Sequence, residues 1–484
     1  MNLKKNLGYN FLLSFSQVLF PLITIPYISR VLHPSGVGQV GFIDSFTYFF
    51  TVVAEFGVVV YGIREVAKLQ NDKIALGKLV SELLLIQFLT SLASFFLYLI
   101  SIYAVWDKIQ DYRLVMLSLS FFLSYFLYCE WFFWGTEQFR FIAIRSICIR
   151  LVAVIAVFLF IKQESDYVYY YAIIAISAIL SLVLNFSRLL ATIPIRFSSL
   201  NLKKHVPYLL TNYGISLLYS VFIMLDTSLL RISSTAVAAG IYLFAIKIIR
   251  ISSGFVSDSL LVLYPHTVTL VQSNNHESIQ TKLLQSANLV LAMSIPLSAG
   301  IFLLADDITT IYLGPEFGNV ANVLRILAVY PIISTFNLFL NKQVLMANHN
   351  ERSILKALAW GSVVFVVLTI SLSSRFGEEG AAVALLAGEI TVLCGNLYYS
   401  IKSKASVKLF SSSHIIQVLI GAAFFLPMLL LLRHWITDEL VLLIVGVVSC
   451  IVVYCIWLVV IVKNSLALNL FRYVKSIASR TKHA

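Results

Sequence analysis

Apolar residues recur along this chain in fourteen blocks that alternate with short polar segments. A block of about 20 apolar residues is long enough to cross a hydrocarbon layer of about 30 Å as an α-helix. We therefore predict an all-α polytopic membrane protein with about 14 transmembrane helices. The predicted spans are residues 7–28, 40–61, 83–105, 114–134, 146–161, 168–187, 206–230, 236–263, 288–305, 322–346, 357–373, 381–401, 415–432 and 440–462.

A weak internal repeat relates the two parts of the chain that contain spans 2 and 8. The segment GVGQVGFIDSFTYFFTVVAEFGVVVYG, which starts at Gly36, matches AAGIYLFAIKIIRISSGFVSDSLLVLYP, which starts at Ala238. In this match Glu55 lies on Asp258. Six spans separate the copies, so both have the same orientation, which predicts two lobes related by a pseudo-two-fold axis along the membrane normal. The predicted parts are an N-lobe (1–205, spans 1–6), a C-lobe (206–405, spans 7–12), an additional helix pair (406–464, spans 13 and 14) and a basic cytoplasmic tail (465–484).

Composition and charge agree with a chain whose main solvent is lipid. Hydrophobic residues make up 60% and charged residues 12% of the 484 positions, whereas charged residues are about 25% of a soluble domain. The net charge of +12 could indicate a nucleic-acid partner, but its distribution is that of a membrane topology. The termini and even-numbered loops hold 23 Lys and Arg residues, and the odd-numbered loops hold 7. By the positive-inside rule both termini are cytoplasmic.

Motifs for enzymatic chemistry are missing from the sequence. The five cysteines lie inside apolar blocks and form no CxxC pair, so neither a metal nor a redox site is expected. There is no P-loop, and no loop is long enough for a nucleotide-binding or large catalytic domain. We expect no cofactor and no enzymatic activity.

Charged residues within the predicted spans are the candidates for function, because burying each one in lipid costs at least about 2.5 kcal/mol. Those selected are Asp44 and Glu55 in span 2, Asp226 in span 7, Lys247, Arg250 and Asp258 in span 8, and Glu389 in span 12. Lys247 and Arg250 are three residues apart and share a helical face at mid-depth. They are suited to bind an anionic headgroup. Alternatively, acidic residues such as Asp44 or Asp226 neutralise them and join helices.

The acidic residues of these spans have two possible roles. Asp44, Glu55, Asp226, Asp258 and Glu389 could exchange an ion as a cavity opens to either side, which would couple transport to a gradient. They could instead pair with cations for structural reasons.

Several stretches resemble the polysaccharide transport family, the lipid-linked oligosaccharide and O-antigen flippases of the multidrug/oligosaccharidyl-lipid/polysaccharide (MOP) exporter superfamily. These are PLITIPYISRVLHPSGVG from Pro21, DTSLLRISSTAVAAGIYLFAIKI from Asp226, YLGPEFGNVANVLRILA from Tyr312 and FGEEGAAVALLAGE from Phe376. The resemblance implies a twelve-helix core whose spans 1, 2, 7 and 8 line a central cavity, plus two C-terminal helices. Span 1 lacks the mid-membrane arginines of the peptidoglycan-precursor flippases.

The leading hypothesis is a flippase in the bacterial cytoplasmic membrane. It would translocate an undecaprenyl-pyrophosphate-linked oligosaccharide, such as an O-antigen repeat unit for lipopolysaccharide, to the outer leaflet by alternating access driven by an ion gradient. Other polysaccharide assembly proteins are possible partners. The alternatives are a multidrug antiporter of the same superfamily, a membrane-embedded polymerase or glycosyltransferase, and a non-transporting scaffold.

Overall fold

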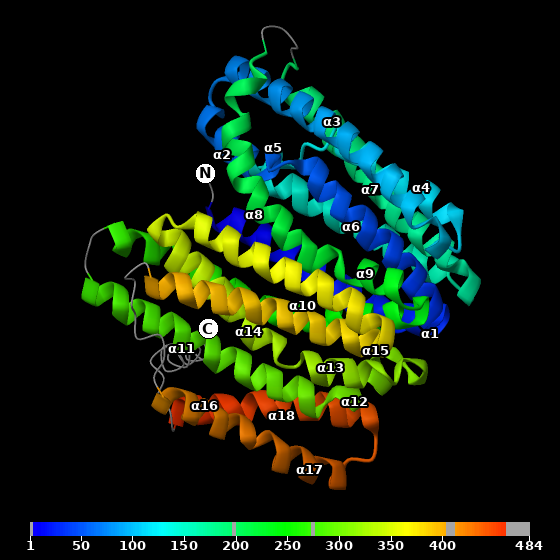
Figure 1. The fold of residues 1–484 in the computed structure, drawn as a ribbon, viewed down its shortest axis with the longest axis vertical. Coiled ribbons are helices and arrows are strands. Elements are labelled where there is room, and N and C mark those ends of the chain that lie inside the picture. Colours follow the sequence, from blue (N-terminus) through cyan, green and yellow to red (C-terminus); the bar gives the residue numbers. More distant parts are fainter. Residues whose placement is uncertain (1–2, 196–199, 273–275, 403–411, 461–484) are drawn as a thin grey trace, which may run out of the picture. The chain divides into compact units, whose positions relative to one another are not determined.

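The computed structural model describes residues 3–195, 200–272, 276–402 and 412–460, which are almost entirely helical (Figure 1). Ten helices in these ranges are long and apolar enough to cross a membrane, or eleven if the bent pair Leu202–Leu210 and Tyr213–Met224 forms one span. The predicted all-α, multi-span fold is confirmed. The tail predicted at 465–484 lies outside the described residues.

The α-helices follow one another through short connections. Their bounds are α1 Leu3–Glu55, α2 Val58–Leu69, α3 Lys73–Ala104, α4 Tyr112–Phe126, α5 Glu130–Gly135, α6 Phe139–Phe160, α7 Tyr167–Thr192, α8 Val206–Met224, α9 Asp226–Ser233, α10 Ala236–Gln272, α11 His276–Leu303, α12 Ala305–Asp307, α13 Val320–Leu327, α14 Tyr330–Phe339, α15 Glu351–Lys402, α16 Ser412–Ala423, α17 Phe425–Trp435 and α18 Glu439–Val460. Two π-helical segments, Ile308–Leu313 and Leu340–Leu345, follow α12 and α14.

Two long helices explain much of the difference between the fourteen predicted spans and the ten or eleven membrane-length helices. Helix α1 breaks at His33, whose φ of 53° is left-handed and which precedes Pro34, so α1 carries predicted spans 1 and 2. Helix α15 breaks at Gly377 (φ 54°) and carries spans 11 and 12. Predicted span 4 begins on the shorter apolar helix α4. Residues 461 and 462 of predicted span 14 lie outside the described residues, and elsewhere the predicted blocks fall on helices or on successive helices separated by short breaks.

The chain divides into two compact units, which are described separately. The first contains Met1–Leu243 with Ser362–Leu385, and the second contains Phe244–Gly361 with Leu386–Ala484. The first unit thus includes α8, α9 and the first turns of α10, which the sequence analysis assigned to the C-lobe. The division into lobes at residue 205 stays a prediction.

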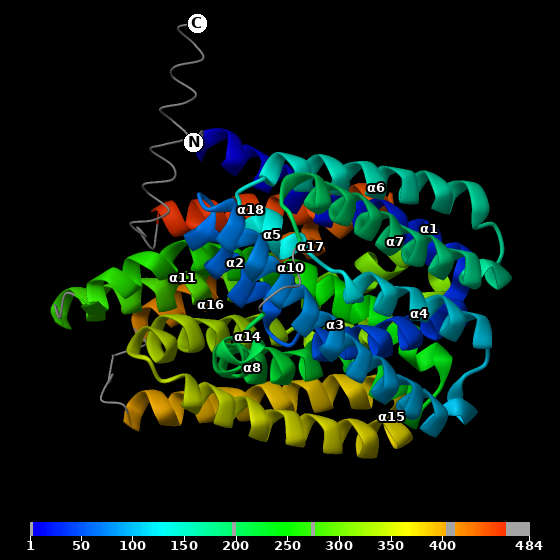
Figure 2. The ribbon, with the colours of Figure 1, turned by 90° about the horizontal axis from the view of Figure 1, so that it is seen from above.

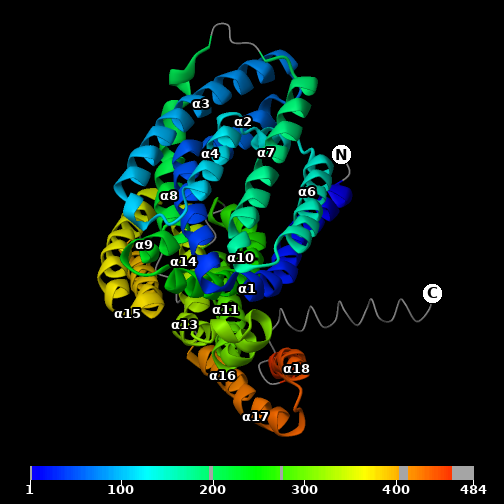
Figure 3. The same cartoon turned by 90° about the vertical axis from the view of Figure 1, so that its right-hand side faces the viewer.

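Helix α1 is the centre of the first unit, where it packs against α3, α4, α6, α7, α8 and α9. Helices α3, α4 and α7 lie side by side (Figures 1 and 3), and α6 and α7 lie beside α1 (Figure 2). Tyr98, Phe122 and Tyr171 are fully buried among them. Asp72 caps α3 by accepting hydrogen bonds from the N–H groups of Ile74 and Ala75.

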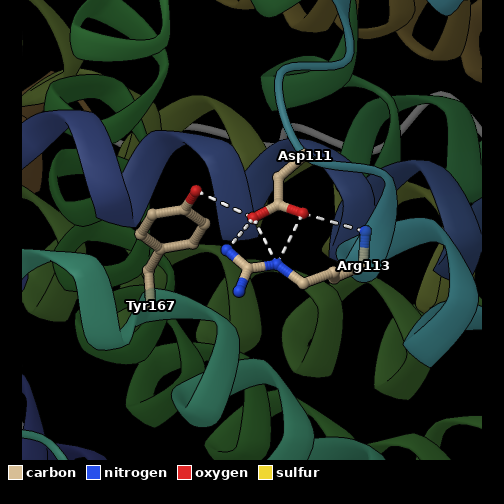
Figure 4. Close-up of polar contacts among 3 residues, drawn as sticks. All are labelled: Asp111, Arg113 and Tyr167. Atoms are coloured by element: carbon tan, nitrogen blue, oxygen red, sulfur yellow. Dashed lines mark hydrogen bonds and ion pairs between the residues drawn. The ribbon is translucent and has the colours of Figure 1, made fainter.

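The end of this unit that the charge distribution places outside contains a hydrogen-bonded carboxylate. Asp111 caps α4 and accepts hydrogen bonds from the Arg113 side chain (Nη2 to Oδ2, 2.6 Å) and the Tyr167 hydroxyl (3.0 Å), as Figure 4 shows. The Arg113 guanidinium lowers the pKa of the Asp111 carboxyl. These contacts tie the start of α4 to the start of α7.

The opposite end of this unit contains a fully buried carboxylate. Glu82 of α3 accepts hydrogen bonds from His205 Nε2 (2.9 Å), Lys204 Nζ (2.8 Å) and the Asn201 N–H (2.9 Å). A further hydrogen bond of 2.8 Å joins His205 Nδ1 and the Tyr61 hydroxyl. The segment that leads into α8 is thereby fastened to α2 and α3.

The second unit is organised around α11, which packs against α14 and α16. Helix α18 contacts both α16 and α17, and these three helices lie together in Figures 1 and 3. Leu291 and Ile295 of α11 pack in one buried cluster with Phe425 and Tyr454. The helices predicted as the additional pair are thus joined to α11 by apolar contacts.

Candidate functional site

The predicted cation pair lies on α10 in the second unit. Lys247 and Arg250 are both half-buried and stand on adjacent positions of one helical face, as their spacing predicted. The Arg250 guanidinium interacts electrostatically with the carboxylate of Glu389 on α15. The structure therefore brings together two residues that the sequence analysis had placed in different spans.

Buried amides hold the Glu389 carboxylate in place. The Asn337 side chain of α14 donates hydrogen bonds from Nδ2 to Glu389 Oε2 (2.8 Å) and to the Glu389 backbone oxygen (3.0 Å). Asn396 Nδ2 in turn donates to Asn337 Oδ1 (3.1 Å). Asn337 is 4% exposed and Asn396 is completely buried. Sequence reasoning missed both residues, although an amide in an apolar span is itself a sign of a polar interior.

Asp258 lies further along α10 and is exposed. It forms no hydrogen bond or ion pair with the residues whose side chains the structure describes. The three charged residues predicted on this helix are thus two half-buried cations followed by an exposed carboxylate.

The three acidic residues of the first unit have different surroundings. Asp226, 1% exposed at the start of α9, accepts hydrogen bonds from the Thr227 N–H (2.6 Å) and the Tyr242 hydroxyl (3.4 Å). Half-buried Asp44 lies within electrostatic range of Tyr171 on α7. Which of the two predicted roles these carboxylates have stays a prediction.

Glu55 is the exception among these carboxylates. It is the last residue of α1, is half-buried and makes no hydrogen bond or ion pair within the described residues. It lies within electrostatic range of Tyr125 and Tyr128, whose rings stack at 5.2 Å.

A cation that the sequence analysis did not select lines a cavity of about 430 Å³ between α1, α6 and α7. It is Arg150, whose Nη1 donates a hydrogen bond to Ser16 Oγ (2.5 Å). Gln17, Thr24 and Tyr170 also line this cavity. Arg150 falls within predicted span 5, so its charge in an apolar block was the sign that could have identified it.

A second, more apolar groove lies in the second unit between α10, α11 and the C-terminal helices. Its volume is about 490 Å³, and its walls include Phe255, Met293, Pro296, Ile451 and Leu458. Pro296 removes a backbone donor from the middle of α11. Such a groove fits an aliphatic chain better than a polar group.

Solved structures with a similar fold are transporters. A lipid II flippase, MurJ, in an inward closed conformation matches with a TM-score of 0.71 at 16% identity, over 95% of this chain and 100% of that one. An inward-facing multidrug resistance MATE family transporter of the MOP superfamily matches with a TM-score of 0.60 at 13% identity, over 80% and 98%. At these identities the likeness shows the MOP superfamily fold.

Sequence relatives point to the same kind of protein. A chain from Escherichia coli (strain K12), described as a candidate O-antigen transporter, is 23% identical over 414 residues, which cover 81% of this chain and 95% of that one. A chain from Shigella dysenteriae with the same description is 22% identical over 403 residues, covering 81% and 98%.

The family follows from the match of a sequence profile to more than half of the chain. The profile of the family described as "Polysaccharide biosynthesis protein" matches residues 3–271. Together with the relatives and the fold, this identifies a membrane transporter and not an enzyme. The chain belongs to the polysaccharide biosynthesis protein family.

Proposed function

We propose that this protein is a flippase for an undecaprenyl-pyrophosphate-linked oligosaccharide, such as an O-antigen repeat unit. It carries the headgroup from the cytoplasmic to the outer leaflet of the bacterial inner membrane by alternating access. The observation that supports this most directly is the pair of cations, Lys247 and Arg250, at mid-depth on α10.

The charge balance of this site fits an anion. Glu389 balances part of the positive charge through its interaction with Arg250, and Lys247 lies on the same face of α10. The three charges therefore sum to a net positive site, in which Arg offers a forked set of donors and Lys a point charge to phosphate oxygens. A cation antiporter would need the opposite balance.

The two chemical parts of the substrate need different surroundings. The sugar and pyrophosphate cannot enter hydrocarbon without losing their hydration, so they need a polar path. A prenyl tail can remain in an apolar environment, and the groove lined by Phe255, Met293 and Leu458 offers one. We assign the tail to this groove.

Export against a concentration difference needs an energy source, which we propose is an ion gradient. Among the predicted carboxylates, Asp226 is occupied by local hydrogen bonds and Glu389 by Asn337. Glu55 and Asp258 have no such partner among the described residues. Glu55 is half-buried whereas Asp258 is exposed, so Glu55 is our candidate for ion exchange. Transport by Glu55→Gln should lose its dependence on an imposed proton or sodium gradient.

Transport in liposomes tests the proposal. Purified protein is reconstituted and supplied with a panel of lipid-linked oligosaccharides and, separately, with cationic dyes. We expect translocation of at least one lipid and no dye export. Dye export without any lipid translocation would establish the multidrug antiporter instead.

The double variant Lys247→Ala with Arg250→Ala tests the site. Loss of two charge-assisted interactions, each worth at least 1.5 kcal/mol, predicts a loss of transport of roughly 100-fold. The matched control is Arg64→Ala with Lys68→Ala, which removes the same charge from exposed positions next to Glu65. Full activity of the first variant, at normal abundance in the membrane, would give the two cations a structural role.

A further inference from the structure

The backbones of α1 and α10 touch where two glycines cross in the first unit. A Cβ atom placed on Gly38 would lie 1.7 Å from the Ala236 oxygen, and one placed on Gly240 would lie 2.0 Å from the Pro34 oxygen. Both distances are far below any real Cβ contact, and the atoms met are backbone atoms. No side chain could move aside, so only glycine fits at either position in this conformation.

This contact is reciprocal. Gly38 faces the carbonyl four residues before Gly240, and Gly240 faces the carbonyl four residues before Gly38. Reciprocity of this kind is the property of a contact across a two-fold axis. Each glycine is the third residue of one matched segment of the internal repeat, and the register that lays Glu55 on Asp258 offsets the two glycines by one residue. Each copy of the repeat therefore contributes one glycine.

Side chains around the crossing strengthen it. Arg231 of α9 donates from Nη2 to the Lys108 backbone oxygen (2.8 Å), and its guanidinium lies 5.9 Å from the centre of the Phe42 ring. The Ser228 hydroxyl donates to the Phe42 oxygen (3.3 Å). The acceptors in these contacts are neutral backbone oxygens and a ring, which water can replace after separation.

We propose that the Gly38–Gly240 crossing is the external gate of the transporter. The gate closes when the two repeats bring their glycine backbones into contact, and it opens when α9 and the start of α10 leave α1. This rests on the proposed function, in which the substrate leaves on the outer side. The charge distribution places the break of α1, between its two predicted spans, on that side. Helix pairs in membranes commonly close on small residues, where backbones approach without a desolvation cost.

Alanine substitutions test the gate, with a cysteine reporter of its state. Thr227 is 1% exposed, and its Cγ2 would lie 3.6 Å from a Cβ on Gly41, directly beside the crossing. Thr227→Cys, in a chain whose five native cysteines are serine, is labelled in cells with a membrane-impermeant maleimide. The controls are Gly8→Ala and Gly254→Ala, where a new Cβ meets nothing within 4 Å.

We expect Gly38→Ala and Gly240→Ala to hold the gate open. Labelling of the reporter should rise and transport should fall, each by about tenfold, while the controls match the unsubstituted chain. Unchanged labelling and transport in both glycine variants would overturn the gate. If lipid is transported normally under those conditions, the proposed function still stands. If labelling rises but no lipid-linked oligosaccharide is ever transported, the gate stands and the proposed substrate falls.

A second test keeps both glycines and so does not depend on how their variants fold. Phe42→Cys and Ser228→Cys are joined by a short cleavable thiol cross-linker across the 3.3 Å contact of these residues. The cross-link should stop transport, and its reduction should restore transport. Full transport with the cross-link in place would overturn the proposal.

Discussion

At one end of the first unit α1 and α10 meet through the bare backbones of Gly38 and Gly240, whereas at the other end α3 holds the segment before α8 through the Glu82 side chain. The glycine contact is made of dispersion and neutral hydrogen bonds, and water can replace it. Glu82 is fully buried, so separation would leave a carboxylate without its partners. The glycine contact is suited to part repeatedly, and the Glu82 contacts are suited to keep the segment before α8 attached to α3.

The largest effect is expected at the Glu82 end. Glu82→Ala leaves the buried His205 ring and the Asn201 N–H without their acceptor, which should reduce the free energy of unfolding by about 3 kcal/mol. Glu65→Ala is the control, because Glu65 pairs with exposed Arg64 and Lys68 and should cost under about 1 kcal/mol. Unfolding in detergent micelles measures both. Equal stability of the two variants would remove the contrast between the ends.

A smaller effect is expected from Arg231→Ala at the gate. It removes the hydrogen bond to the Lys108 oxygen and the contact with Phe42, so the closed state should lose about 1.5 kcal/mol relative to the open one. Labelling of the Thr227→Cys reporter should increase about tenfold.

Arg188→Ala is the matched control for Arg231. Its guanidinium lies at the same 5.9 Å from an aromatic ring, that of Phe141, but away from the crossing. If Arg188→Ala increases labelling of the Thr227→Cys reporter as much as Arg231→Ala does, the gate has no special dependence on Arg231.

The smallest effect is expected at Asp111. Arg113 lowers the pKa of this carboxyl in the folded chain, so its stabilisation is present above the ordinary aspartate pKa of about 3.9 and is lost as the pH falls through the folded value. Asp111→Asn should cost about 1 kcal/mol at pH 7, because Arg113 is largely exposed.

Thermal unfolding between pH 7 and pH 3 measures this difference. The difference in unfolding temperature between Asp111→Asn and the unsubstituted chain should become smaller as the pH falls below 4. Asp107→Asn, at an exposed side chain, is the control. A gap that stays constant with pH would show that the Asp111 charge contributes nothing.

The sequence by itself determined the helices and the stripe of charge on α10. Crossing lipid requires a run of apolar residues, and helical periodicity places Lys247 beside Arg250, so both features depend on neighbours along the chain. The breaks at His33 and Gly377 were not predicted, because the backbone angles of one residue leave little trace in hydropathy.

Only the tertiary structure decided which distant residues meet. The sequence analysis named Asp44 and Asp226 as examples of acidic residues that could neutralise Arg250, whereas the structure brings Glu389, held by Asn337, within its electrostatic range. Likewise, the repeat placed Gly38 and Gly240 near the starts of its matched segments, one residue out of register, and did not predict that they touch. That α8, α9 and the start of α10 join the first unit follows from the closed crossing. Such pairings depend on how helices pack in space, a property that no local pattern of residues encodes.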